Sequence, residues 1–209
     1  MPTRYLKTAL PLLILGVWGV IFHARTLGFR AFTTTTYALE KPGPLPRSAP
    51  SWSLSNQHGD RLSFTNGQAP FILYHFMYLH CSYVCGITFS YVQELHRNLE
   101  EMTPQRLLMV SVTVDPQRDH TRDLYDAWLS LNRPRGWMLA RHENPETMNH
   151  DFKMMGVSHY RLPNGDFNHS AYFYLVDPRN NLIEVFDPAQ GLGKISSRLA
   201  EIVTPEALP

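Results

Sequence analysis

Cys81 and Cys85 are the residues of this 209-residue chain whose type and spacing could do chemistry. They are the only cysteines in the sequence, and three residues separate them. An apolar run of strand length precedes the pair and a helix-like pattern follows it, so we expect the pair at the start of a helix. Unpaired backbone N–H groups and the helix dipole favour thiolate over thiol there. Thiolate is the form that binds soft metals or attacks disulfides.

The C-x-x-x-C spacing favours a metal site but leaves alternatives open. Redox enzymes of the thioredoxin type use C-x-x-C. On a helix, residues i and i+4 have Cβ atoms about 5–6 Å apart, whereas a relaxed disulfide needs about 3.8 Å. A disulfide between Cys81 and Cys85 therefore requires a distorted first turn, but two thiolates that bind one soft ion do not. A redox-active disulfide, a structural disulfide and two buried thiols are the alternatives.

The elements around the cysteines predict an α/β fold with a mixed central sheet. Apolar runs at 71–78 and 107–114 predict buried strands, and residues 52–64 predict an N-terminal β-hairpin. A second hairpin is expected over 171–186. Helices are predicted after the cysteines, after Asp119 or Thr121 as the cap, from Asn144 to Gly156, and at 195–202. This order of elements is that of a thioredoxin-like fold.

The fold predicts where the site lies. In open α/β sheets, ligands bind outside the carboxyl ends of the parallel strands. Cys81 and Asp115 each follow a predicted parallel strand, and the strand after His169 is expected to be antiparallel, so His169 should reach the same edge. For His75 and His80 we expect a packing or surface role, with His80 the first alternative ligand because it adjoins Cys81.

The N-terminal region predicts a membrane anchor and a linker. Residues 9–22 carry no charge. This run is shorter than the ~20 residues that span a bilayer, but Lys7 and Arg25 can extend it by snorkelling. We expect a tail at 1–8, an anchor at 9–26 and a domain at 51–205. The Pro/Thr-rich linker at 27–50 should be extended and helix-free.

The charge balance argues against a nucleic-acid partner. The chain has 19 basic and 18 acidic residues, and the basic residues form no cluster. Nucleic-acid binding requires a basic patch that meets the phosphates.

The sequence resembles the Sco/SenC family of copper proteins in three segments. These are LHCSYVC (79–85), VSVTVDPQRD (110–119) and FNHSAYFYLVDP (167–178). The resemblance implies a thioredoxin-like fold, copper ligands Cys81, Cys85 and His169, and an acidic position near the site at Asp115. It also implies an extracytoplasmic role in supplying the dinuclear copper centre of cytochrome c oxidase. Family members usually have proline after the second cysteine, where this chain has Gly86.

The chemistry of these donors is consistent with copper. Thiolates select Cu(I), and an added imidazole also suits Cu(II). The same set would suit catalytic zinc. We expect a copper chaperone rather than an enzyme, anchored by one span in a bacterial inner membrane with its domain facing the periplasm. Its expected client is cytochrome c oxidase subunit II or a similar protein. The alternative is a thiol-disulfide oxidoreductase that reduces the cysteines of a client copper site.

Overall fold

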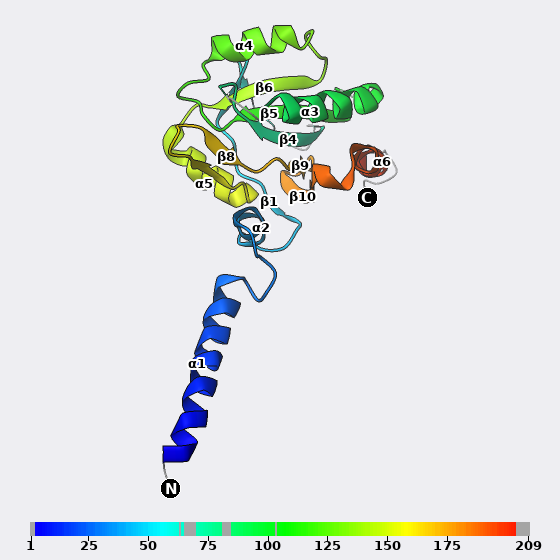
Figure 1. Ribbon diagram of the computed structural model, residues 1–209. Coiled ribbons are helices and arrows are strands. Elements are labelled where there is room, and N and C mark those ends of the chain that lie inside the picture. Colours follow the sequence, from blue (N-terminus) through cyan, green and yellow to red (C-terminus); the bar gives the residue numbers. More distant parts are fainter. Residues whose placement is uncertain (1–2, 63, 65–69, 81–84, 103, 204–209) are drawn as a thin grey trace.

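The computed structural model describes residues 3–62, 64, 70–80, 85–102 and 104–203, which form a mixed sheet with helices on both faces (Figure 1). The strand order is β1-β10-β9-β4-β5-β6-β2-β3, and β7 and β8 form a separate pair. The strands are β1 (Arg47–Ser48), β2 (Leu54–Asn56), β3 (Arg61–Leu62), β4 (Phe71–Met77), β5 (Leu107–Thr113), β6 (Trp137–His142), β7 (His159–Arg161), β8 (Phe167–His169), β9 (Phe173–Val176) and β10 (Asn181–Phe186). The helices are α1 (Thr3–Arg25), α2 (Thr34–Glu40), α3 (Cys85–Leu99), α4 (Thr121–Ser130), α5 (Pro145–Met155) and α6 (Leu192–Val203), with 3-10 turns at Glu100–Met102 and Pro188–Gln190.

Strand β4 is the centre of the sheet and is buried along its whole length. It pairs in parallel with β5 and antiparallel with β9. Its alternate side chains enter two cores: Leu73 packs with Leu95 of α3, and Phe76 packs with Phe152 of α5. Burial on both faces explains why β4 is an unbroken apolar run. The predicted α/β class, the mixed sheet and both predicted hairpins are confirmed.

The ends of two helices show which local signals the fold uses. Asn144 caps α5 by accepting a hydrogen bond from the Glu146 N–H (2.9 Å), and Gly156 ends this helix in the left-handed conformation (φ 81°), as predicted. The predicted cap of α4 is wrong, because the N-cap is His120. The carboxylate of Asp119 is used elsewhere, at the candidate site.

The prediction of an extended, helix-free linker is wrong for residues 34–40. Residues 34–40 form α2, and 47–48 form β1, which pairs with β10. The prolines of this region all follow α2, and the Thr33 hydroxyl accepts a hydrogen bond from the Thr36 N–H (3.0 Å). The Arg47 guanidinium then donates to the carbonyls of Met154 (3.2 Å) and Met155 (3.1 Å) at the end of α5.

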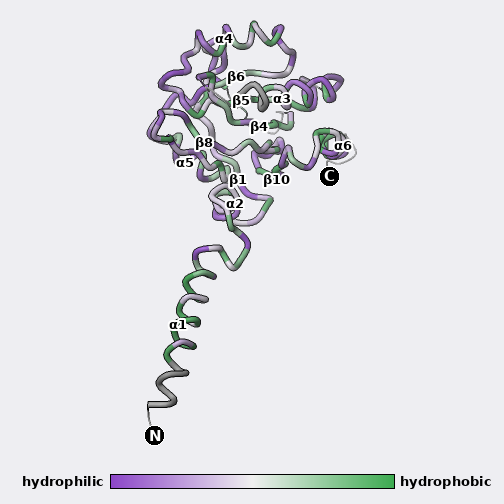
Figure 2. Tube along the Cα trace, in the orientation of Figure 1, coloured by the Kyte–Doolittle hydropathy of each residue, from purple (hydrophilic) through white to green (hydrophobic). Residues whose placement is uncertain are grey.

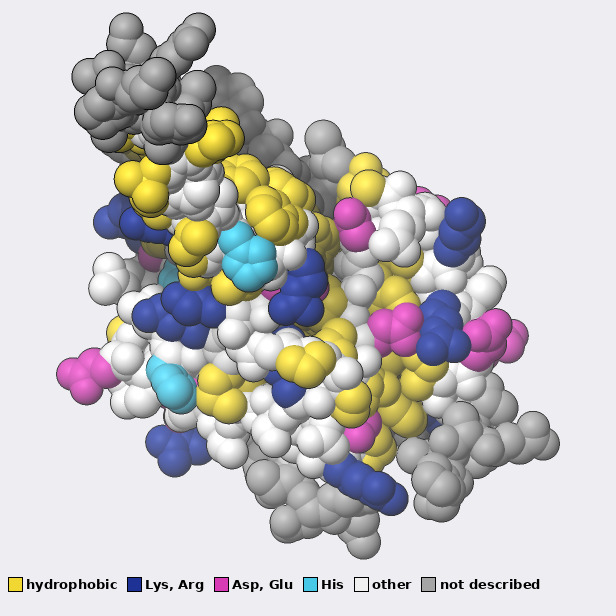
Figure 3. Space-filling view, turned by 90° about the horizontal axis from the view of Figure 1, so that it is seen from below, with side chains coloured by type: hydrophobic (Ala, Val, Ile, Leu, Met, Phe, Trp, Pro, Cys, Tyr) yellow, Lys and Arg dark blue, Asp and Glu magenta, His cyan; other side chains and the backbone are white. Residues whose placement is uncertain are grey.

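Helix α1 projects from the rest of the molecule (Figure 1), and most of its described length is hydrophobic (Figure 2). The view from the side on which α1 projects shows hydrophobic side chains at the surface (Figure 3). The exposed large apolar residues of α1 are Leu10, Leu12, Leu13, Ile14, Leu15, Val17, Trp18, Val20, Ile21 and Phe22. In the part of the chain that the structure describes, no helix has both the length and the apolarity needed to cross a membrane.

The close contact between the end of α5 and α2 predicts that Gly156→Ala destabilises the protein. The left-handed conformation would cost about 1–2 kcal/mol. The new Cβ would also lie 2.8 Å from Leu39 Cα and 2.9 Å from Arg47 Nη2, so the neighbouring chain would have to move. We expect urea unfolding to show a clear loss in the free energy of unfolding.

Gly165→Ala is the matched control for this prediction. Gly165 also has a positive φ (89°), but no atom lies within 4 Å of the Cβ position. The Gly156 variant should lose more stability than the Gly165 variant by about 1 kcal/mol or more. Equal losses would show that the packing of α5 against the chain at 38–47 contributes nothing.

Candidate functional site

Tyr78 joins two distant segments at the edge of the sheet where β4 ends. Its hydroxyl accepts a hydrogen bond from the Phe167 N–H (3.3 Å). Its ring packs edge-on against the rings of Phe167 (centroids 5.8 Å apart) and His169 (5.7 Å). Strand β9 runs antiparallel to β4 with His75 opposite Phe173, so the residues before Phe173 reach this edge. The predicted position of His169 beside the segment that leads into Cys81 is therefore confirmed.

One ring nitrogen of His169 is hydrogen-bonded, and the other has no hydrogen-bond partner among the described residues. Its Nδ1–H donates to the carbonyl of Ser170 (3.1 Å), so in the neutral ring the lone pair is on Nε2. Burial lowers the pKa of His169, while the hydrogen bond to the Ser170 carbonyl raises it in part. The lowered pKa favours the neutral imidazole near pH 7, which is the form that binds a metal.

The structure describes only part of the cysteine pair, namely the backbone of Cys85. Cys81 lies outside the described residues, as do the side chain of Cys85 and the predicted redox-active disulfide. The backbone of Cys85 begins α3, as predicted for the second cysteine, and the predicted position of Cys81 lies outside the described residues. No three described His, Cys, Asp or Glu side chains are grouped as metal ligands. The ligand set Cys81, Cys85 and His169 therefore stays a prediction.

Asp115 is buried at the same edge and binds Arg118. The carboxylate accepts a hydrogen bond from Arg118 Nε, and this bond raises the pKa of the guanidinium. Arg118 Nη2 also donates to the Gly165 carbonyl in the β7–β8 turn (3.1 Å). Asp115 and Arg118 thus connect the loop after β5 to the hairpin that carries His169. Asp115 lies at the edge of the sheet where the site is predicted, and its described side-chain partner is an arginine.

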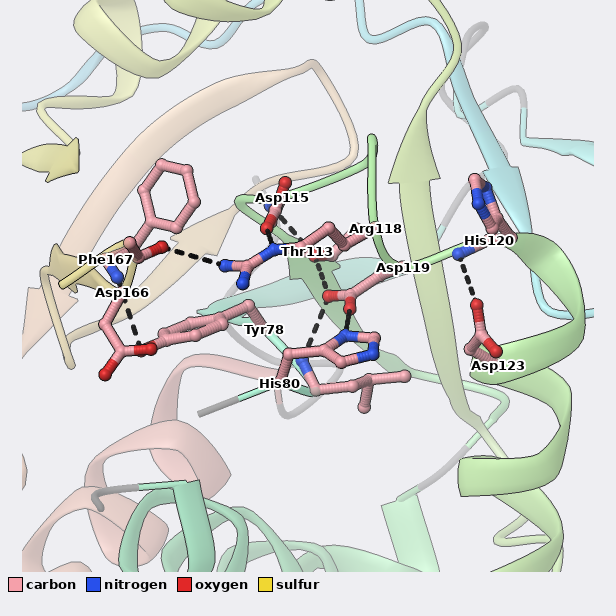
Figure 4. Close-up of polar contacts among 12 residues, drawn as sticks. Tyr78, His80, Thr113, Asp115, Arg118, Asp119, His120, Asp123, Asp166 and Phe167 are labelled. Carbon is pink, nitrogen blue, oxygen red and sulfur yellow. Dashed lines mark hydrogen bonds and ion pairs between the residues drawn. The ribbon is translucent and has the colours of Figure 1, made fainter. Parts of the chain in front are cut away.

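Asp119 is the residue of this edge that the sequence analysis missed. Its side chain is fully buried and accepts three hydrogen bonds (Figure 4). The donors are the Leu79 N–H (2.9 Å), His80 Nδ1–H (2.8 Å) and the Thr113 hydroxyl. Two of the donors precede Asp119 by about 40 residues in the chain. No local pattern indicates such a pairing, and a carboxylate before a helix is typical of a cap.

His75 is a core residue, as expected. It is 2% exposed, its Nδ1 lies 3.4 Å from the Ser111 hydroxyl, and its ring packs on Phe173. Burial lowers the pKa of His75 to about 3, with a smaller contribution from His169. The imidazole is neutral at pH 7 and contributes apolar packing to the central strand.

Comparison with known proteins assigns the chain to a family. Residues 41–204 match the SCO1/SenC family model. The chain belongs to the SCO1/SenC family. It is 22% identical to the protein sco1 of Schizosaccharomyces pombe over 145 residues, which are 68% of this chain and 55% of that relative. The chain thus spans about half the length of this curated relative.

Solved structures agree on the fold. The copper-bound ScoI of Arabidopsis thaliana matches with a TM-score of 0.64 at 16% identity, over 74% of this chain and 97% of that one. BsSco, a member of the Sco family of cytochrome c oxidase assembly proteins in which a disulfide switch was identified, matches with a TM-score of 0.62. The identity to BsSco is 18%, over 78% of this chain and 96% of that one. The predicted thioredoxin-like fold is confirmed.

The lowered pKa of His75 predicts a loss of stability in acid. The folded pKa of about 3 lies below the ordinary value of about 6.5, so between these values the unfolded chain binds more protons. Stability from this group is complete above pH ~6.5 and falls by about 1.4 kcal/mol per pH unit as the pH decreases towards 3. Urea unfolding at pH 7, 6 and 5 should show that His75→Phe is less acid-sensitive than the unmodified chain.

His150→Ala is the control for the acid prediction. His150 is an exposed residue of α5, so its removal should leave the pH dependence unchanged. Burial also lowers the pKa of His159 and His169, and these groups keep part of the acid sensitivity in every variant. The role of His75 would be contradicted if His75→Phe and His150→Ala had the same slope against pH.

Proposed function

We propose that this protein is a copper chaperone that binds copper through Cys81, Cys85 and His169. It passes the ion to the dinuclear copper centre of cytochrome c oxidase, in subunit II or a similar client. The observation that carries the proposal is the contact between His169 and Tyr78, because Tyr78 lies three residues before Cys81. Membership of the SCO1/SenC family supports it, as does the copper-bound structure of a relative.

The chemistry of the donors fits a chaperone. Two thiolates hold Cu(I), and the Nε2 atom of His169 adds a nitrogen donor that Cu(II) favours. Three protein ligands leave a coordination position open for a ligand of the client. The ion can then pass from one protein to the other without being released as a free ion. The buried Asp115 carboxylate is hydrogen-bonded to Arg118, so we assign it a positioning role rather than a ligand role.

The thiol-disulfide oxidoreductase is the second candidate. The disulfide switch of BsSco favours it, since that protein shares the fold. In this role Cys81 would attack a client disulfide and Cys85 would resolve the mixed disulfide, so the client would leave with two thiols and Cys81–Cys85 would become a disulfide. Each further turnover would need an added dithiol to reduce that disulfide. Metal analysis of the reduced chain separates the candidates: copper in a 1:1 ratio supports the chaperone, and turnover without metal supports the reductase.

Substitution of the three proposed ligands should separate the two oxidation states of copper. His169→Ala should retain near-stoichiometric Cu(I), because two thiolates suffice for this soft ion. It should lose the thiolate-to-Cu(II) charge-transfer absorption, because the imidazole is the nitrogen donor. Cys81→Ser and Cys85→Ser should each lose both forms. The measurements are a competition assay for Cu(I) and an absorption spectrum of the Cu(II) form.

His159→Ala is the matched control for His169→Ala. His159 lies opposite His169 in the β7–β8 pair, but its Nε2 is within hydrogen-bond distance of Asn149 (3.0 Å). The control should keep the Cu(II) spectrum. An unchanged spectrum in His169→Ala would mean that a different residue supplies the nitrogen donor.

We also propose that α1 attaches the protein to a bacterial inner membrane, with the domain in the periplasm. Large apolar side chains are exposed along residues 10–22, and water would solvate them unfavourably. The region holds no Asp or Glu, while Lys7 and Arg25 flank its apolar part. Such flanks are typical of segments held in a membrane interface or across it.

A fusion to alkaline phosphatase tests both parts of the membrane proposal. The enzyme joined after Pro209 should be active, because it folds only in an oxidising compartment. The activity should sediment with membranes and resist extraction at alkaline pH. An inactive fusion would contradict the topology, whereas active fusion in the soluble fraction would contradict the attachment. Removal of residues 1–26 should release the folded domain and leave its copper binding unchanged.

A further inference from the structure

His80 is held in one orientation although half of its side chain is exposed. The exposed fraction is 51%, whereas the Asp119 side chain that binds it is fully buried. The contact joins His80 Nδ1 to Asp119 Oδ1 at 2.8 Å. Because a carboxylate accepts, Nδ1 carries the hydrogen, and in the neutral ring Nε2 has a free lone pair. Figure 4 shows the imidazole with Nδ1 directed at the Asp119 carboxylate.

A second histidine-carboxylate pair shows what a structural role looks like in this protein. The His142 side chain is fully buried, and its Nε2 donates to Asp151 (2.8 Å). Its Nδ1 accepts a hydrogen bond from the Asn144 N–H (3.1 Å), so both ring nitrogens are used within the fold. His80 differs because half of its side chain is exposed. Among the described residues, only its Nδ1 has a hydrogen-bond partner.

The two oxygens of the Asp119 carboxylate have different described donors. The Leu79 N–H and the Thr113 hydroxyl donate to Oδ2, and His80 Nδ1 donates to Oδ1. The buried carboxylate thereby fixes the tautomer and direction of His80. A histidine whose second nitrogen donates to a carboxylate is the arrangement that metal-binding histidines use. The carboxylate fixes the ring so that the other nitrogen points away from Asp119 and can meet a metal.

We propose that His80 is the entry ligand of the copper site. This inference rests on the proposed function. Nε2 binds the ion transiently while copper passes between an external ligand and the resident site. The Cu–Nε2 bond forms as the bond to the external ligand breaks, and it breaks in turn when a thiolate takes the ion. The oxidation state of copper does not change, and Nε2 binds the ion through its lone pair.

The position of His80 fits this role. His80 directly precedes Cys81 in the sequence. It follows Tyr78, which contacts His169, by two residues. Its exposed ring can meet a ligand of a partner protein before the partner reaches a buried group. Thiolate selects Cu(I), whereas imidazole is less selective. This difference favours transfer of the ion from His80 to the cysteines.

The test separates the rate of copper exchange from the affinity for copper. Asparagine can place its side-chain N–H where His80 has Nδ1, so His80→Asn keeps a donor to Asp119 but removes Nε2. His80→Ala removes both, and the exposed His150→Ala is the matched control. Each full-length chain is loaded with Cu(I) in detergent. Stopped-flow spectroscopy then follows transfer to bathocuproine disulfonate, and equilibrium competition gives the affinity.

We expect His80→Asn and His80→Ala to transfer Cu(I) about tenfold more slowly, with affinity close to that of the unmodified chain. Urea unfolding should leave His80→Asn as stable as the unmodified chain. Unchanged transfer in His80→Asn, with copper binding lost in Cys81→Ser, would overturn the inference and leave the proposed function standing. An affinity that falls as much as the rate would make His80 a resident ligand and also overturn it. A chain that takes up no copper would overturn the proposed function itself.

Discussion

The pairing of β4 between β5 and β9 is the constraint on which the rest of the structure depends. The parallel register with β5 brings the residues after Met77 and Thr113 to one edge of the sheet. The antiparallel register with β9 brings the residues before Phe173 to that same edge. Strand β4 is buried on both faces, and a one-residue slip would exchange the side chains of its two cores. The register is therefore fixed by packing, and the candidate site inherits its geometry.

Two buried carboxylates then fix the loops at this edge in different ways. Asp115 is paired with Arg118, which extends the connection to the β7–β8 turn. The described hydrogen-bond donors of Asp119 include no arginine or lysine; they are a backbone amide, a hydroxyl and an imidazole. Removing a carboxylate from water costs free energy unless such donors surround it. The donors must therefore stay in place, which holds the chain at 79–80 immediately before Cys81.

Residues 34–48, which contain α2 and β1, connect the projecting helix α1 to the domain. Strand β1 adds to the edge of the sheet beside β10, and Arg47 satisfies two carbonyls at the end of α5. Free carbonyls at a helix end need such partners. The close approach of Leu39 to Gly156 is possible because glycine has no Cβ. Residues 34–48 are thus part of the packed domain, and α1 projects from it.

The sequence by itself determined the elements whose signals are local. The unbroken apolar run of β4 predicted a buried strand, and Asn144 with Gly156 marked both ends of α5. It also indicated, from strand directions, that His169 lies beside the segment leading into Cys81. It did not find α2, because a threonine cap and seven residues are a weak signal among prolines. The β7–β8 pair was also missed, since its strands of three residues each have no clear alternation.

The tertiary structure alone decided the partners of Asp119. Its donors come from the end of β4 and the end of β5, and the folding of the sheet brings them together across about 40 residues of sequence. Beside a helix start, the local sequence favours a capping role for the same carboxylate. Burial overrides this capping preference. A carboxylate removed from water needs hydrogen-bond donors, and at Asp119 the fold supplies them from other segments. His80, a loop histidine in the sequence, is thereby oriented in the fold, and its Nε2 has no hydrogen-bond partner among the described residues.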